Sequence, residues 1–249
     1  MSAETSGPPF RVLYSGPNER IEIDIVTIHG LGSNAEWAWT WKGEKGHVNW
    51  LRDSNMLPAV IPYARIITYN YESQWHINAP KTRLELCGEH FVKDLDYFRR
   101  DERDRPLLIV AHSLGGLVVI HGLLHANCTE NLKYIPRNTA GFLALGTPFR
   151  GTEMQSLAAI VTQCLKFLGS HDGLTADLNL DNDHLADKVN DFCVLKNQLG
   201  IPSYCFFELL KSDYGKKDKI PGLFKKIIVQ EASAHIPGWG RVGLNTDHF

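Results

Sequence analysis

Residues 106–120 read PLLIVAHSLGGLVVI, and this stretch decides the fold. Its first part, Pro106–Ala111, is a continuous apolar run, which is typical of a strand covered on both faces. The part after the serine is apolar on nearly all sides and predicts a buried helix. Between them stands Ser113, with Ala111 two residues before it and Gly115 two residues after it. A tight turn needs small residues at both positions, so the stretch predicts a nucleophile elbow, G-x-S-x-G with alanine at the first glycine.

Five further runs have the composition of strands and alternate with helical patterns. This alternation favours βαβ units and predicts an α/β fold, with a mostly parallel sheet of at least six strands and helices on both faces. The other expected strands are Ile21–Ile28, Ala64–Tyr71, Ala140–Leu145, Ile201–Phe207 and Lys226–Val229. The expected helices are Trp50–Val60, Leu84–Phe98, Leu114–His125, Met154–Leu168 and Leu185–Leu195.

We expect one domain over residues 1–249, with an insertion in it. The stretch 151–200 lies between two expected strands and carries only helical and loop patterns. It is long for a crossover connection. We therefore predict that residues 151–200 form a helical cap over the site.

The composition excludes several classes of protein. The 249 residues carry 26 Lys+Arg against 28 Asp+Glu, so the chain lacks the basic footprint of a nucleic-acid-binding protein. Five widely spaced cysteines without a C-x-x-C pair predict free thiols and no sequence-local zinc site. No secretory signal is visible, and we expect a cytoplasmic protein. His121 and His125 lie four apart, as zinc ligands do, but lack the glutamate and third ligand of such a motif.

A serine nucleophile needs a base, and the base needs an orienting acid. In the fold that carries such an elbow, the order along the chain is serine, acid, histidine. Glu208 closes the expected strand Ile201–Phe207, and His248 lies downstream of the last expected strand. The alternatives that stay open are Glu231 and Asp213 for the acid and His235 for the base.

The loop His29-Gly30-Leu31-Gly32 follows an early strand, where this fold places an oxyanion donor. We expect the N–H groups of Leu31 and Leu114 to form an oxyanion hole. The residues expected at the substrate site are His29, Gly30, His112 and Trp75. A two-glycine loop also occurs in dinucleotide-binding proteins, but the third glycine of that motif is missing here.

Six lysines follow Glu208, between Lys211 and Lys226. A solvated loop is the ordinary interpretation of such a run. The alternative is a patch for anionic headgroups, which would give peripheral membrane contact.

Six segments together resemble a known family. They are HGLGSNAEW (29–37), VNWLRD (48–53), ARIITYNYESQW (64–75), LLIVAHSLGGLV (107–118), ALGTPFRG (144–151) and NTDHF (245–249). Together they resemble the serine esterase/lipase-like α/β-hydrolases related to the GPI inositol-deacylase family. More narrowly, they are similar to a fungal, NLR-like branch in which this domain precedes NACHT, ankyrin or TPR modules.

The resemblance implies an α/β-hydrolase fold that cleaves a small-molecule or lipid ester without metal or cofactor. It implies Ser113 as nucleophile, Glu208 as acid and His248 as base. It leaves two alternatives, a signalling domain with little activity and an amidase or thioesterase on the same fold. Because a helix normally packs after the histidine loop in this fold, we also expect that the sequence is truncated, as a shortened gene product, an expression fragment or a domain cut from a longer chain.

Overall fold

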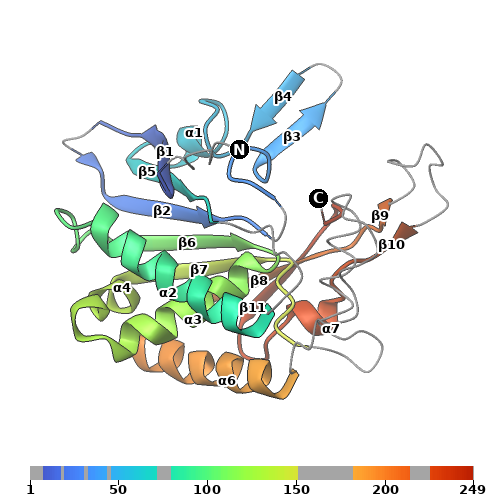
Figure 1. Ribbon diagram of the computed structural model, residues 1–249. Coiled ribbons are helices and arrows are strands. Elements are labelled where there is room, and N and C mark those ends of the chain that lie inside the picture. Colours follow the sequence, from blue (N-terminus) through green and yellow to red (C-terminus); the bar gives the residue numbers. More distant parts are fainter. Residues whose placement is uncertain are drawn as a thin grey trace, which may run out of the picture.

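The computed structural model describes residues 8–17, 20–30, 33–43, 46–71, 80–150, 182–213 and 225–248. Within these residues, seven strands form one sheet, shown in Figure 1. In sheet order the strands are β1 (Phe10–Ser15), β5 (Ala64–Tyr69), β2 (Ile23–Ile28), β6 (Leu107–His112), β7 (Thr139–Leu145), β8 (Ser203–Glu208) and β11 (Gly240–Leu244). The edge strand β1 runs antiparallel to β5, and the other neighbours are parallel. The predicted α/β class with a mostly parallel sheet is confirmed.

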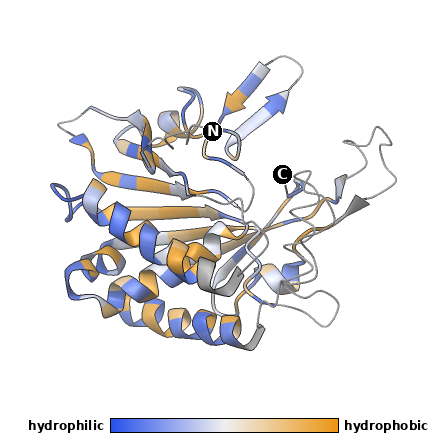
Figure 2. Ribbon diagram, viewed as in Figure 1, coloured by the Kyte–Doolittle hydropathy of each residue, from blue (hydrophilic) through white to orange (hydrophobic). Residues whose placement is uncertain are grey.

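Three long helices cover one face of the sheet (Figure 1). They are α2 (Pro80–Phe98), α3 (Gly115–Cys128) and α6 (Asn182–Leu199). Helix α3 is buried along most of its length, as its apolar composition predicts. The central strands β2 and β6 are apolar along most of their length in Figure 2, whereas α2 and α6 carry both polar and apolar residues. Short helical turns η2 (Glu130–Leu132) and α4 (Tyr134–Arg137) connect this layer back to β7.

The opposite face is covered by a segment rich in tryptophan. It contains the hairpin of β3 (Thr40–Gly43) and β4 (Gly46–Asn49) and the short helix α1 (Leu57–Val60). Trp39 and Leu51 from this segment pack on β2 and β5 in a second apolar core. The site described below lies between the two layers, at the carboxyl edge of the sheet.

One predicted strand is wrong, and two strands of the seven-stranded sheet were missed. Residues 227–229 are irregular, and only Lys225–Lys226 form a two-residue strand, β10, paired with β9 (Ser212–Asp213). Ile228 and Val229 are instead buried in a small cluster beside β8 and the helix α7 (Glu231–Ala234). The run is therefore apolar because it is buried in a loop. The strands β1 and β11 were not predicted, because β1 is a mostly exposed edge strand and β11 contains two glycines.

The predicted helix Trp50–Val60 is present only at its end. The Asn49 carboxamide accepts hydrogen bonds from the N–H groups of Leu51 and Arg52, which stabilises a turn instead. The helix begins at Leu57, where Pro58 occupies a first-turn position.

Part of the predicted cap lies outside the described residues. Residues 151–181, which include the expected helix Met154–Leu168, are among them. Residues 182–199 form α6, whose Leu185, Phe192 and Leu195 belong to the main core against α3. No helix in the described part of the chain is long and apolar enough to cross a membrane.

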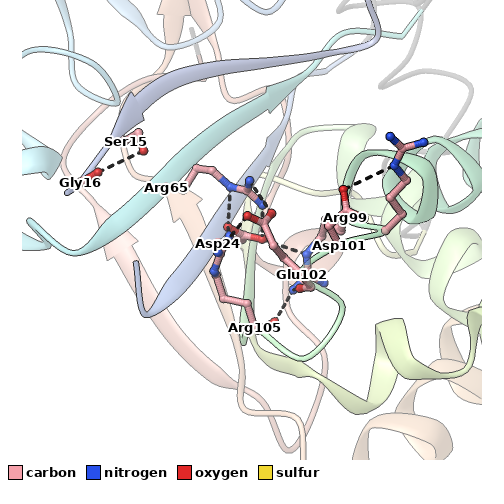
Figure 3. A network of polar contacts seen from close by, with 9 residues as sticks. Ser15, Gly16, Asp24, Arg65, Arg99, Asp101, Glu102 and Arg105 are labelled. Atoms are coloured by element: carbon pink, nitrogen blue, oxygen red, sulfur yellow. Dashed lines mark hydrogen bonds and ion pairs between the residues drawn. The ribbon is translucent and has the colours of Figure 1, made fainter. Parts of the chain in front are cut away.

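A buried charge cluster joins the elements at the amino edge of the sheet (Figure 3). The Asp24 carboxylate on β2 is fully buried and accepts hydrogen bonds from Arg65, Arg99 and Arg105. The Nε atoms of Arg65 and Arg99 lie 2.8 and 2.9 Å from its oxygens. Glu102 pairs with Arg65 and Arg105 and supplies a second negative charge. One carboxylate thus links β2, β5, the end of α2 and the loop before β6.

We expect Asp24→Asn to lower the free energy of unfolding by about 3–5 kcal/mol, because it leaves buried guanidinium groups uncompensated. Urea unfolding followed by circular dichroism measures this change. The control is Glu89→Gln, which removes a more exposed pair with Lys93 and should cost less than about 1 kcal/mol. Equal stability of the two variants would contradict this role for the cluster.

Candidate active site

Ser113 stands in a strained turn between β6 and α3. Its φ of 52° makes it the one non-glycine residue with a positive φ in the described part of the chain. An L-residue adopts this conformation only where its surroundings hold it, and such strain clusters at functional sites. The turn matches the geometry expected of a nucleophile elbow.

The turn is possible because neighbouring backbones approach it closely. A Cβ atom at Gly115 would lie 2.5 Å from the His29 carbonyl oxygen and 2.8 Å from that of Ile28. A Cβ atom at Gly30 would lie 2.8 Å from the Cβ of Ser113. Small residues are therefore needed around Ser113 for two reasons. They avoid clashes within the turn, and they let the backbone after β2 approach it.

His248 lies against the serine. Its Nε2 atom is 3.2 Å from the Ser113 Oγ, and its Nδ1 atom is 3.4 Å from Oε2 of Glu208. All three side chains are at most 5% exposed. With Nδ1–H donating to the carboxylate, Nε2 is left as an acceptor for the serine hydroxyl. Both distances are at the long end of the range for hydrogen bonds.

Glu208 ends β8 and is held on both of its oxygens. Its Oε1 accepts the backbone N–H of Val229 at 2.6 Å, and its Oε2 faces His248. Gly146, at the end of β7, has a φ of 55°, and a Cβ there would lie 3.0 Å from the imidazole. Only glycine leaves room at this position for the histidine and the acid to meet.

The parallel sheet explains why these residues converge. Ser113 follows β6, Gly146 follows β7, and Glu208 ends β8. The carboxyl ends of parallel strands meet at one edge, which is where open α/β sheets bind ligands. His248 reaches the same edge because β11 runs parallel to β8.

The alternative acids and base lie differently. The Glu231 carboxylate is half-exposed and pairs with Arg241 at 3.1 Å. The backbone of Asp213 is in β9, and its side chain lies outside the described residues. His235 follows α7 and is only partly buried. Among the described side chains, Glu208 and His248 are therefore the acid and histidine that meet at Ser113.

Half of the expected oxyanion hole can be placed. Leu114 directly precedes α3 and is fully buried beside the serine. Leu31 and Trp75 lie outside the described residues. His29 is fully buried and stacks on the Tyr71 ring at 4.7 Å, and the Tyr71 hydroxyl donates to the His29 carbonyl. The His29 imidazole therefore supports the loop from within the core, and its expected contact with substrate stays a prediction.

A cavity of about 230 Å³ is lined by Glu208 and His248 but not by Ser113. Its walls include Trp39, Trp50, His112, Leu145, Phe206 and Leu244. His112, expected at the substrate site, lines this cavity and contacts the His248 backbone.

In the described part of the chain, no group of three or more His, Cys, Asp or Glu residues could hold a metal ion. His121 and His125 line a separate hollow between α2, α3 and α6. Burial lowers the pKa of His121 to about 4, so its imidazole is neutral at pH 7. In the described part of the chain, Cys128, Cys193 and Cys205 are thiols outside any disulfide.

Besides the contact of His112 with the His248 backbone, two contacts at the site were not expected from the sequence. One is the Val229 N–H on Glu208, described above, and the other is the Ser212 hydroxyl, which accepts the His248 N–H at 3.1 Å. Neither contact could be predicted from the sequence. Every residue except proline has a backbone N–H, and nothing in the sequence distinguishes Ser212 from other serines. Only the apolar run that contains Val229 marked that segment as buried.

Comparisons with known proteins concern the fold of the chain. No family model matches the chain. The protein SERAC1 of zebrafish (Danio rerio) is 28% identical over 211 residues, which are 75% of this chain and 32% of the relative. Human SERAC1 is 23% identical over 219 residues, 82% of this chain and 33% of the relative. The chain thus spans about a third of the length of these relatives.

Among solved structures, the mature form of the lipase BlEst2 of Bacillus licheniformis superimposes with a TM-score of 0.62. It is 15% identical, and the match covers 96% of this chain and 90% of the lipase. The form of that lipase with its propeptide gives a TM-score of 0.60, also at 15% identity, over 96% of this chain and 49% of the other. The expected link to GPI inositol-deacylases and to NACHT or repeat modules stays a prediction. The chain has the α/β-hydrolase fold.

Proposed function

We propose that this chain is a serine hydrolase that cleaves carboxylic esters through an acyl-enzyme, with Ser113 as nucleophile, His248 as base and Glu208 as acid. The observation that carries the proposal is the continuous contact from the Ser113 hydroxyl through the His248 imidazole to the Glu208 carboxylate. It occurs on a strained turn at the edge of the sheet. A structural role for these residues would not require the strain at the serine.

The proposed reaction proceeds in two halves. His248 accepts the Ser113 proton at Nε2 while Oγ attacks the ester carbonyl, and the imidazolium then protonates the departing alcohol. Water attacks the acyl-enzyme with the same histidine as base, which releases the acid and restores the serine. Glu208 stabilises the imidazolium in both halves. Its own burial is offset by the Val229 N–H, which keeps the carboxylate oriented toward His248.

The N-terminus of α3 stabilises the negative charge that develops on the carbonyl oxygen of the substrate. The Leu114 N–H directly follows the nucleophile at the beginning of α3, where the helix dipole is positive. We propose the Leu31 N–H as the second donor. One such donor is worth about 3–4 kcal/mol in the transition state.

We expect a fluorophosphonate probe to modify Ser113, because the probe reacts only with an activated serine. Mass spectrometry of the modified peptide identifies the site. Ser113→Ala should remove the adduct, and His248→Ala should slow labelling and lower the rate of ester hydrolysis by about 10⁶-fold while the fold is kept. An unmodified Ser113 in folded protein would contradict the proposal. Rates on matched ester, thioester and amide substrates then decide the bond that is cleaved.

We expect Glu208→Gln to lower kcat by about 10⁴-fold, as amide replacement of the triad acid does in serine proteases. The loss should be smaller than that of His248→Ala. The matched control is Glu231→Gln, which only removes the surface pair with Arg241 and should leave kcat unchanged. If Glu208→Gln were fully active and Glu231→Gln impaired, Glu231 would be the acid.

A further inference from the structure

His248 reaches the serine from a segment that has no regular secondary structure. Strand β11 ends at Leu244, and residues 245–248 follow as bends and irregular backbone. The segment is held instead by hydrogen bonds to the stretch after β8. The Leu209 N–H donates to the Leu244 carbonyl, and the Leu210 N–H donates to the Thr246 carbonyl. Both bonds end two residues or more before the histidine.

The peptide groups of His248 itself are held by two side chains. Its N–H donates to the Ser212 Oγ at 3.1 Å, and its carbonyl oxygen lies 3.0 Å from the His112 Nε2. A carbonyl oxygen only accepts, so the His112 Nε2 must carry the proton. Burial and, as a smaller contribution, the neighbouring His248 together lower the pKa of His112 to about 3. His112 is therefore neutral at pH 7, and its single N–H is committed to this bond.

The surroundings leave the His112 ring little freedom. It lies 4.8 Å from the His248 ring and 6.5 Å from the Trp39 ring, between centroids. A Cβ at Gly30 would come within 3.3 Å of its Nδ1, so the Gly30 backbone also lies close to the ring. These neighbours orient the His112 donor, as a positioning group requires.

We propose that His112 is a positioning residue that fixes the His248 backbone and thereby sets the imidazole on the Ser113 hydroxyl; this inference rests on the proposed function. His112 is adjacent to Ser113 at the end of β6. Ser113 and the residue that holds the His248 backbone are therefore neighbours at the end of one strand, which fixes their relative position. A misplacement of about 1 Å in such a pair costs about 10²-fold in rate, which gives this contact its importance.

The test compares His112→Gln with His112→Asn. Both variants carry a carboxamide, but only the glutamine places its N–H where the imidazole has Nε2. His112→Phe is the third variant, which keeps a ring and has no donor. His90→Phe on the exposed face of α2 is the matched control and should behave as wild type. The readouts are the rate of fluorophosphonate labelling at Ser113, kcat and KM on an ester, and amide hydrogen exchange in the peptide that contains His248.

We expect His112→Asn and His112→Phe to lower the labelling rate and kcat by about 10- to 100-fold with KM changed by less than about twofold. Exchange in the His248 peptide should become faster in both. His112→Gln should retain the wild-type rate within about threefold and keep the protection. A glutamine variant as impaired as the asparagine variant, or an asparagine variant equal to wild type, would overturn the inference.

The failure of the proposed function gives a different result. If Ser113 in the wild-type protein is not labelled, the proposed hydrolase activity fails. Hydrogen exchange still decides whether His112 holds the segment, because it needs no activity. Protection that is lost with asparagine and kept with glutamine supports the contact, and equal exchange in all variants overturns it. If His112→Phe does not fold, the asparagine and glutamine pair decides alone.

Discussion

The turn at Ser113 is the constraint on which the rest of this structure depends. A serine at a φ of 52° is unfavourable on its own, and it persists because the chain around it permits no other path. Gly115 must pass within contact of the Ile28 and His29 carbonyls, so α3 is fixed against the end of β2. The long apolar helix that follows is buried in the main core and holds the turn from behind. The order of the central strands and the position of α3 are therefore part of the site.

Stability and chemistry are divided between the two edges of the sheet. At the amino edge, Asp24 gathers three arginines from separate elements and locks β2, β5 and α2 together (Figure 3). At the carboxyl edge, Ser113, Glu208 and His248 lie on loops and strand ends. A rigid sheet between the edges keeps these loops in register. Such a division lets the loops carry strain and buried polar groups while the fold is held elsewhere.

The burial of Glu208 and His248 is tolerated because each polar group has a partner. Glu208 has the Val229 N–H on one oxygen and His248 on the other. The His248 N–H has the Ser212 hydroxyl. Since an unpaired buried carboxylate is costly, these partners specify where the acid and the histidine lie as much as the packing does. The irregular apolar segment around Val229 supplies one of these partners. If this segment were a strand of the sheet, the Val229 N–H would pair with a neighbouring strand and could not bind Glu208.

The sequence by itself determined the class of fold, the position of the elbow and the order of Ser113, Glu208 and His248 along the chain. These are local properties: an apolar run of strand length, small residues around a serine, and a carboxylate at the end of a strand. Only the tertiary structure decided that Ile228–Val229 is a buried loop, that Gly240–Leu244 is the last strand, and that His112 and Ser212 hold the His248 backbone. Backbone hydrogen bonds between segments more than 30 residues apart leave no periodic pattern in a sequence. An apolar run shows that a segment is buried, but it does not show whether the segment is a strand or a loop, because both can bury the same apolar side chains.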